Sequence, residues 1–517
     1  MTKSIKDLES IITTSYGQNP ETDIILGAAM LGDSISTGKY VSIPKSMLNR
    51  HWLIAWATGT GKTKTFQYLC EQFSLSGIPV LVMDMKWDLS GISQPWNLND
   101  KVQSRIDQIG IQREPQNIPV EFLSLDGKDG AQLKSTVWEF WPILFAKILW
   151  LNEVQESILS ILFKYASDKW YILIDLEDIK KLLQRSIWWW KTEIEAEYGK
   201  ISESSISIIL RNIIQLEWQW ASKFFWELSF DVEDLMMTRG GKWVISILRL
   251  ANMQSYPKLF STFMLSLLAE TYIKLPEEWD VLKPKLIIFI DEAHLIFDDI
   301  SKELLDQMET TIKLIRSKWV GIYFCTQSPT DIPENILGQL GTKIQHALRA
   351  FTAKDAKDIK LMAQNFPNSD FYKVEDSLTS MGIGQALVTT LDTKWIVTPL
   401  AQTMICPPST RMDTITDSEL QSITSRSDIY TKYSKTIERE SAADILGAKI
   451  SNWETTSSDW WSTWWFWSWI MWNILWNIGK TAAKELAKKA ANQIWIKWST
   501  ATSIGNTASS IFGKMIK

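Results

Sequence analysis

The clearest chemical signal in the sequence is a glycine-rich loop between an apolar run and an amphipathic stretch, Thr58-Gly59-Thr60-Gly61-Lys62-Thr63. Glycines let successive backbone N–H groups turn toward an anion, and a following helix N-terminus adds a favourable dipole. A lysine suits the β- and γ-phosphates of a nucleotide, and a threonine hydroxyl suits Mg²⁺. We therefore expect the phosphates to be bound by Ala57, Thr58, Gly59, Thr60, Gly61, Lys62 and Thr63.

This loop departs from the usual pattern at one position. The spacing G-x-x-x-x-G-K-T puts its first glycine at position 56, where the chain has Trp56. The alternative interpretation is a glycine-rich turn that binds nothing. The strand and helix patterns on either side of the loop disfavour it.

A second signal is an apolar run, residues 286–290, that ends in the two carboxylates Asp291 and Glu292. At the carboxyl edge of a parallel sheet, Asp291 would hold Mg²⁺ and Glu292 would polarise the attacking water. Acidic residues also end strands simply to meet solvent. The loop upstream favours the hydrolytic interpretation, in which Lys62 and Glu292 are catalytic.

Three further side chains are weaker candidates for the same chemistry. Gln327 follows the next apolar run and would contact the γ-phosphate, although a polar turn is the alternative. Arg349 and Arg316 are candidate arginine fingers supplied by a neighbouring subunit. For each arginine, a surface ion pair is an equally good explanation.

Polar residues near these motifs leave two interpretations open. Asp84, Lys86 and Asp88 follow a second apolar run, and they either line the site or form a solvated loop. His294 is better explained as a polar contact at a helix start than as a site residue.

Apolar runs alternate with helical patterns through most of the chain, which predicts an α/β fold with a parallel-rich sheet. We expect strands at 79–84, 243–250, 285–291, 319–327, 343–350 and 385–391, and helices at 152–166, 206–217 and about 417–447. The predicted parts are a lead-in at 1–45, a core of 46–94 and 241–405, a mainly helical insertion at 95–240, a helical extension at 406–450, and a low-complexity linker with an amphipathic tail helix at 451–517.

The composition sets limits on the class of protein. A length of 517 residues predicts about two to four domains. Lys+Arg 54 against Asp+Glu 59 gives a net charge of −5, which carries no overall signature of nucleic-acid binding. The 3 cysteines form no metal-binding spacing or disulfide framework, and the first residues do not resemble a signal peptide, so we expect a cytoplasmic protein.

Taken together, the motifs resemble the HerA-like P-loop ATPases, relatives of the HerA and FtsK DNA-translocating motors. The resemblance is carried by residues 48–65 (LNRHWLIAWATGTGKTKT), 82–93 (VMDMKWDLSGIS), 286–297 (LIIFIDEAHLIF) and 315–355, with a weaker match at the tail. It implies a RecA-like core that uses ATP and Mg²⁺, assembles as a homo-oligomer, by resemblance a hexameric ring, and moves DNA as a translocase or helicase. A nuclease partner is a further expectation, although residues 1–45 leave room for only a shortened N-terminal barrel.

Two other functions fit the same motifs. One is a secretion- or conjugation-type ATPase that moves protein at a membrane. The other is an ATP-binding scaffold that has lost hydrolysis, against which the Asp291–Glu292 pair argues.

Tryptophan is unusually common, with Trp 29 against Gly 23, whereas glycine normally makes up about 7% of a chain. Trp52, Trp56, Trp87 and Trp319 occupy positions where the family resemblance implies glycine. Our hypothesis is that the source organism decodes UGA as glycine. At position 56 it predicts a backbone with positive φ, where a tryptophan would be strained and would weaken nucleotide binding.

The same hypothesis changes the interpretation of the tail. As written, the Trp-rich stretch 460–477 resembles an interfacial membrane segment. With glycine at those positions it becomes a flexible Gly/Ser linker, which we prefer, and the chain then has no integral membrane segment.

Overall fold

The structure is a computed structural model that describes residues 4–446, apart from 58, 97–98, 189–190, 219–221, 251–256, 279–280, 298–301, 350–351, 436 and 438. The chain divides into a unit of residues 1–445 and a second unit of residues 446–517. The expected linker and tail helix at 451–517 therefore lie outside the described residues. Within the described part of the chain, no helix combines the length and apolar character needed to cross a membrane.

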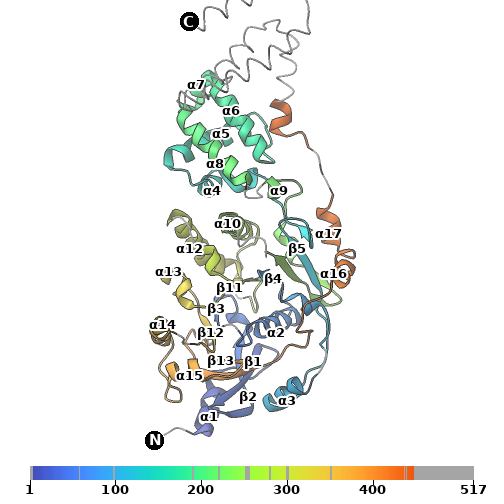
Figure 1. Ribbon diagram of the computed structural model, residues 1–517, viewed down its shortest axis with the longest axis vertical. Helices are drawn as coiled ribbons and strands as arrows, with labels where there is room; N and C mark the ends of the chain where they lie inside the picture. The colour runs from blue at the N-terminus through green and yellow to red at the C-terminus, as the bar shows by residue number, and fades with distance from the viewer. Residues whose placement is uncertain are drawn as a thin grey trace, which may run out of the picture. The chain divides into compact units, whose positions relative to one another are not determined.

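Twelve strands of the described residues form one mixed sheet in the order β2-β1-β14-β13-β12-β3-β11-β10-β4-β9-β5-β6 (Figure 1). From β12 to β6 every neighbouring pair is parallel. The strands are β1 (Asp23–Leu31), β2 (Ser34–Pro44), β3 (Trp52–Ala55), β4 (Val80–Asp84), β5 (Val120–Ser124), β6 (Ala131–Gln132), β9 (Ile245–Arg249), β10 (Leu286–Ile290), β11 (Val320–Thr326), β12 (Thr342–His346), β13 (Gln385–Thr389) and β14 (Ala401–Ile405), with a separate hairpin of β7 (Thr238–Arg239) and β8 (Lys242–Trp243). The expected α/β fold with a parallel-rich sheet is confirmed.

One strand direction differs from the expectation. The apolar run at 385–391 forms β13, which pairs with β12 in the antiparallel sense. Two helices, α14 and α15, connect these strands, whereas a single crossover helix would return the chain for a parallel strand. The N–H of Leu348 after β12 donates to the carbonyl of Leu378 near the end of α15, at 2.7 Å. The second helix has thus brought the chain back to the carboxyl edge, from which β13 begins.

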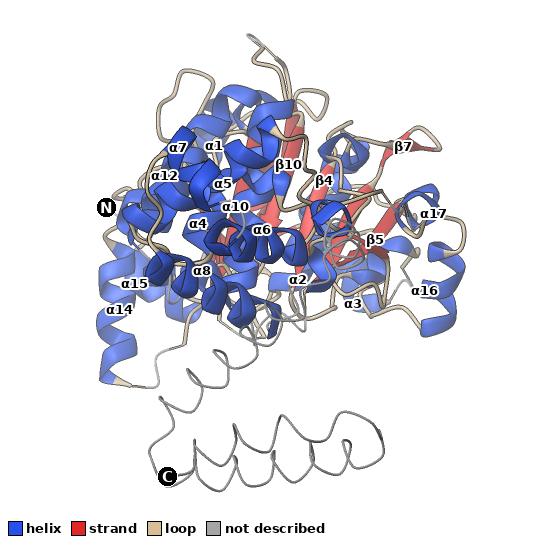
Figure 2. Ribbon diagram, turned by 90° about the horizontal axis from the view of Figure 1, so that it is seen from above, coloured by secondary structure: helices blue, strands red, loops and turns tan. Residues whose placement is uncertain are grey.

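Helices flank both faces of the sheet, and α12 and α2 lie on opposite sides of β10 and β11 (Figures 1 and 2). The helices are α1 (Ile5–Ser15), α2 (Lys62–Leu75), α3 (Asp100–Ile109), α4 (Trp141–Ile148), α5 (Glu153–Asp168), α6 (Leu176–Trp188), α7 (Lys191–Tyr198), α8 (Glu203–Leu216), α9 (Ser222–Phe224), α10 (Pro257–Lys274), α11 (His294–Phe297), α12 (Lys302–Ile315), α13 (Glu334–Leu337), α14 (Ala353–Ala363), α15 (Val374–Ser380), α16 (Asp417–Thr424) and α17 (Asp428–Tyr433).

Aromatic packing fixes α2 against the sheet. The ring of Phe66 meets Phe289 of β10 edge-on at 4.3 Å between centroids, and Phe73 meets Tyr323 of β11 at 5.8 Å. All four rings are buried. Each ring buries a large apolar area, so this contact sets where the first turn of α2 lies relative to the ends of β10 and β11.

The segment 95–240 holds the helices α4 to α8, which pack on one another, and it also supplies β5 and β6 to the main sheet. The prediction of a single helix over about 417–447 is wrong. The described residues there form α16, α17 and a further helical stretch at 442–446, and α17 starts anew because the hydroxyl of Ser427 accepts the N–H of Tyr430 at 2.9 Å.

Six tryptophans of the described residues have a left-handed backbone: Trp87, Trp141, Trp150, Trp170, Trp319 and Trp395, with φ between 52° and 67°. Only His51 and Glu292 join them among the described residues other than glycine. Two of the six, Trp87 and Trp319, are positions where glycine was expected. Trp56 is not among the six, so the prediction of a strained backbone at that position is wrong.

Candidate functional site

The carboxyl ends of four adjacent parallel strands place the candidate residues together. β3 leads into the glycine-rich loop, β11 separates it from β10, and β4 lies on the far side of β10. Asp291 and Glu292 follow β10, Gln327 follows β11, and Asp84 ends β4. In such sheets ligands bind at this edge of the strands.

The loop has the backbone that phosphate binding requires. Gly59 and Gly61 have φ of 81° and 100°, which only glycine adopts without strain. Gly61 is the N-cap of α2 and has no side chain that could cap the helix. The N–H groups of the first turn of α2 therefore point toward the loop without a cap from Gly61. The hydroxyl of Thr60 donates to the carbonyl of Ala57 at 2.7 Å, and the N–H of Ala57 donates to Ala347 at 3.1 Å. Thr58 lies outside the described residues.

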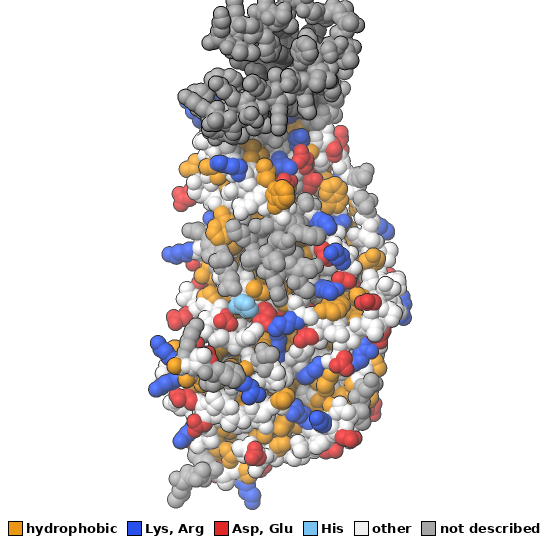
Figure 3. All heavy atoms as spheres, in the orientation of Figure 1, with side chains coloured by type: hydrophobic (Ala, Val, Ile, Leu, Met, Phe, Trp, Pro, Cys, Tyr) orange, Lys and Arg blue, Asp and Glu red, His pale blue; other side chains and the backbone are white. Residues whose placement is uncertain are grey.

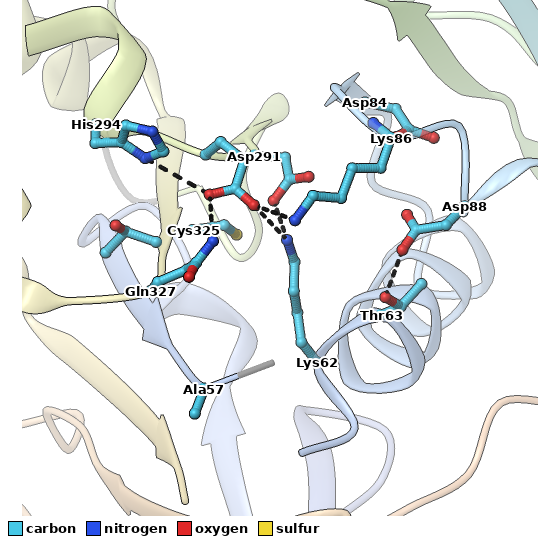
Figure 4. A network of polar contacts seen from close by, with 12 residues as sticks. Ala57, Lys62, Thr63, Asp84, Lys86, Asp88, Asp291, His294, Cys325 and Gln327 are labelled. Carbon is cyan, nitrogen blue, oxygen red and sulfur yellow. Dashed lines mark hydrogen bonds and ion pairs between the residues drawn. The ribbon is translucent and has the colours of Figure 1, made fainter. Parts of the chain in front are cut away.

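Lys62 brings the loop and the paired acids together (Figure 4). Its ammonium group forms an ion pair with Asp291 and lies 3.8 Å from Glu292. All three side chains are buried. The two motifs that lie 229 residues apart in sequence therefore share one site.

The environments of the two carboxylates push their pKa values in opposite directions. Burial raises the pKa of Asp291, and the charge of Lys62 only partly offsets it. Burial also raises the pKa of Glu292, but the ammonium groups of Lys86 and Lys62 outweigh it and leave that pKa lowered. Glu292 is thereby kept ionised, as a general base requires.

The backbone of Glu292 is itself unusual, with φ of 47°. A residue other than glycine in this region costs about 1–3 kcal/mol and needs support from its surroundings. The next N–H, of Ala293, donates to the carbonyl of Cys325 on β11 at 2.9 Å. This bond holds the turn in the conformation that directs the Glu292 carboxylate into the site. The sequence carried no signal for it.

The loop after β4 contacts the candidate site, which favours the first of the two interpretations left open for Asp84, Lys86 and Asp88. Lys86 forms an ion pair with Oε1 of Glu292. The hydroxyl of Thr63 donates to Asp88 at 2.7 Å. Buried Asp84 accepts the N–H groups of Lys86, Trp87 and Leu89 at 2.9, 2.7 and 3.3 Å and so shapes the loop. Burial, with the nearby charge of Asp88, raises the pKa of Asp84 to about 7.

Two further side chains face the other oxygen of Glu292. Nε2 of Gln327 donates to Oε2 at 3.5 Å, and Nδ1 of His294 lies 3.5 Å from the same atom. His294 begins α11, so it is at a helix start and also touches the site. Gln327 lies beside the general-base candidate, at the end of the strand between the loop and the acids.

The two arginines lie at different edges of the sheet. Arg349 is exposed and follows β12 at the edge that carries the site. Arg316 precedes β11 and is half-buried. The seven residues of β11 separate Arg316 from the site edge, which is roughly 20 Å at about 3.3 Å per residue. The structure thus keeps Arg316 away from the other candidates.

Trp56 makes a contact that the sequence did not predict. Nζ of Lys62 lies 3.9 Å from the centre of its buried ring. The indole therefore occupies space beside the lysine that would meet the phosphates. A glycine at this position would remove that contact.

The donors at this edge suit a magnesium nucleotide. Mg²⁺ prefers oxygen ligands and is usually held by one or two carboxylates together with phosphates and water. Thr63, Asp88 and Asp291 offer a hydroxyl and two carboxylates next to Lys62. Loop N–H groups and a buried lysine are the donors that a phosphate requires.

The model of the helicase HerA-like C-terminal family matches residues 31–463. The chain belongs to this family. The match spans both the glycine-rich loop and the Asp291–Glu292 pair, so the resemblance seen in the sequence motifs is confirmed.

Several solved structures are similar to this HerA-like chain. The bacterial conjugative coupling protein TrwBdeltaN70 has 13% identity over 77% of this chain and 92% of its own, with a TM-score of 0.48. Plasmid coupling protein TrwB in complex with ADP and Mg²⁺ has 13% identity over 77% and 96%, with a TM-score of 0.48. VirB4 of Thermoanaerobacter pseudethanolicus has 14% identity over 74% and 96%, with a TM-score of 0.45. No curated protein sequence matches the chain.

Proposed function

We propose that this protein is an ATP-hydrolysing motor that acts as an oligomeric DNA translocase or helicase. One observation carries the hydrolytic part: Lys62 of the loop meets Asp291 and Glu292 at the end of a neighbouring strand. The HerA-like family membership supports the motor and its DNA substrate.

Each residue has a distinct role in this proposal. Residues 57–63 cradle the phosphates, and Lys62 neutralises charge on the β- and γ-phosphates. Lys86 binds Oε1 of Glu292, so Oε2 is the oxygen that accepts the proton of the attacking water. Gln327 lies beside Oε2 and orients the water or the γ-phosphate. Thr63 and Asp291, with Asp88 nearby, would hold Mg²⁺, which would neutralise charge on the phosphates.

The proposals about the assembly of the protein and about its DNA substrate rest only on its membership of the family. The proposal includes a ring of identical subunits, with six as the expected number, in which exposed Arg349 is the better placed of the two arginines to reach a neighbour's nucleotide. On the face shown in Figure 3, Lys/Arg and Asp/Glu side chains of the described residues are interspersed. A nuclease partner and a cytoplasmic location stay predictions.

Lys86 is expected to be a positioning residue for Glu292. Replacing it with methionine removes the cation that holds the carboxylate, so kcat for ATP should fall about ten- to a hundredfold with little change in KM, since a displaced catalytic group mainly slows the chemical step. Lys86→Arg should restore most of the rate. Lys357→Met, on an exposed face of α14, is the matched control. A Lys86→Met chain with unchanged kcat would contradict the role.

ATP binding and hydrolysis are measured on two full-length proteins, the chain with Trp56 and its Trp56→Gly variant. Each of the two serves as a parent for further substitutions. The indole of Trp56 lies against Lys62, so we expect the glycine parent to bind ATP more tightly. Lys62→Ala in either parent is the control for any nucleotide effect.

The decisive experiment for the cargo is ATP hydrolysis with and without DNA. We expect DNA to stimulate the rate severalfold, with DNA affinity falling steeply between about 50 and about 200 mM salt, because phosphate contacts release counterions. Both single-stranded and double-stranded DNA are tested. If neither parent hydrolyses ATP, the proposal that this protein is an ATP-driven motor is contradicted. Turnover without DNA binding, together with co-fractionation with membranes, would favour a motor that moves protein.

A further inference from the structure

A fully buried carboxylate, that of Glu71, lies on α2 outside the candidate site. A buried charged group is costly unless hydrogen bonds satisfy it. Its two oxygens accept the N–H groups of Ser409 and Thr410, both at 2.9 Å, and the hydroxyl of Thr410 also donates to it. The nearest cation is Arg113, with Nη1 at 3.7 Å from Oε2. Glu71 therefore fixes the chain that follows β14 to the helix that starts at the phosphate loop.

A second side chain of α2 holds the same segment, residues 409–415. Nε2 of Gln67 donates to the hydroxyl of Thr410 at 2.8 Å and to the carbonyl of Arg411 at 2.6 Å. Gln67 and Glu71 are four residues apart and share one face of the helix. Both side chains are buried, as is Thr410. One face of α2 is thus occupied by this segment.

The segment 409–415 also contacts the loop that follows β4. The N–H of Ile415 donates to the hydroxyl of Ser90 at 3.2 Å. A Cβ built on Gly91 would lie only 1.9 Å from the carbonyl oxygen of Asp413, so the two backbones pack as closely as a glycine allows. The segment therefore lies between α2 and the loop after β4 and is attached to both.

Both of these neighbours carry residues of the candidate site. Ser90 follows Lys86 by four positions in the loop after β4, and Lys86 forms the ion pair with Glu292. The first turn of α2 carries Lys62, which lies 3.8 Å from the same carboxylate. The spacing between α2 and the loop thus decides whether the two lysines can meet Glu292 together.

We infer that Glu71 is a positioning residue for ATP hydrolysis that acts through Lys86, an inference that rests on the proposed function. Glu71 holds residues 409–415 on α2, and these residues hold the loop after β4 in the place where Lys86 reaches Glu292. Without the carboxylate, the segment loses this attachment and the loop can shift. A misplacement of about 1 Å far from the reacting atoms can slow catalysis by about a hundredfold.

The first test is Glu71→Gln in both parents. Glutamine keeps the size of the side chain, but one of its oxygens becomes an NH₂ group that faces a donor instead of accepting from it. We expect kcat for ATP to fall about tenfold with KM changed by less than about threefold. Glu121→Gln is the matched control, because Glu121 is also buried and accepts the hydroxyl of Ser427 farther along the chain, on β5. It should leave kcat unchanged.

A double-mutant cycle with Lys86→Met supplies a readout that a merely structural role would not move. If Glu71 acts by holding Lys86 in place, the two substitutions remove the same interaction and their effects on kcat do not add. The double variant should then hydrolyse ATP within about threefold of Lys86→Met alone. A role in folding alone would lower the free energy of unfolding, measured in urea, without this coupling.

Amide hydrogen exchange tests the attachment without nucleotide. Exchange at the amides of residues 86–91 should be several times faster in Glu71→Gln than in the parent, because local opening of the loop becomes easier, and it should be unchanged in Glu121→Gln. Thr410→Val removes the hydroxyl between Glu71 and Gln67 at nearly constant volume. It should lower kcat severalfold, and it carries the test if Glu71→Gln does not fold.

The outcomes separate this inference from the proposed function. Unchanged kcat in folded Glu71→Gln and Thr410→Val, in a parent that Lys86→Met slows, overturns the inference alone. The same holds if Glu121→Gln slows hydrolysis equally, or if the effects of Glu71→Gln and Lys86→Met add in full. If neither parent hydrolyses ATP, the proposed function fails, and the role of Glu71 in hydrolysis fails with it. Unchanged exchange at residues 86–91 in Glu71→Gln overturns the attachment itself.

Discussion

Replacing Glu292 with glutamine is expected to slow ATP hydrolysis by about a hundred- to ten-thousandfold, the usual contribution of a general base. Glutamine keeps the size of the side chain and its contact with Lys86, but it cannot accept the proton of the attacking water. ATP binding should persist, because Lys62 and the loop N–H groups are unchanged. Single-turnover hydrolysis and ATP binding, measured on the same preparation, check both parts.

Two companion variants sharpen this result. Lys62→Ala should lose ATP binding as well as hydrolysis, since it removes the cation between the loop and the acids. Glu375→Gln, on exposed α15, should change neither. Unchanged turnover in Glu292→Gln would instead favour a protein that binds ATP without using this acid.

The second large effect concerns the left-handed tryptophans. Changing Trp141, Trp150 and Trp170 together to glycine should raise the free energy of unfolding by about 2 kcal/mol, because a left-handed backbone costs other residues about 1–2 kcal/mol each and glycine returns part of this as chain entropy. Trp141 and Trp170 are 63% and 89% exposed, so little packing is lost there, whereas the loss of packing at Trp150, which is 45% exposed, offsets part of the gain. Urea unfolding of the parent and the variant measures the difference.

A matched pair separates backbone strain from the loss of an exposed indole. Trp170, with φ of 57°, is 89% exposed, and Trp218, which lies in a helical stretch and is not among the left-handed residues, is 81% exposed. Trp170→Gly should stabilise the protein, whereas Trp218→Gly should destabilise it by about 0.5–1 kcal/mol through helix propensity. Destabilisation by both would contradict the strain argument.

The gene offers an independent check on the decoding hypothesis. If UGA is read as glycine in the source organism, the codons at positions 87 and 319 are UGA. These are the positions at which the family resemblance and the left-handed backbone agree. UGG codons there would contradict the hypothesis.

Features that depend on a local pattern of residues could be predicted from the sequence. The strands β4, β9, β10, β11 and β12 are continuous apolar runs and were predictable, as were the glycine-rich turn and the acids at a strand end. The strands β5 and β6 were not predicted, because they lie in the segment 95–240 that was expected to be mainly helical. The direction of β13 depends on two helices crossing the sheet, which no local pattern records. The contact of Lys86 with Glu292 and the left-handed Glu292 arise from tertiary packing, and the contact of Glu71 with Ser409 joins residues 338 positions apart.

The strand between the loop and the acids has a mechanical consequence. β11 ends in Thr326, whose hydroxyl donates to Asp331 at 2.6 Å, and Ser328 with Asp331 caps the short helical turn that follows. These hydrogen bonds tie the turn that follows Gln327 to the end of β11. If hydrolysis removes a γ-phosphate beside Gln327, we expect a shift of Gln327 to be passed through residues 328–331 to α13, and this turn would then couple the state of the nucleotide to movement outside the site.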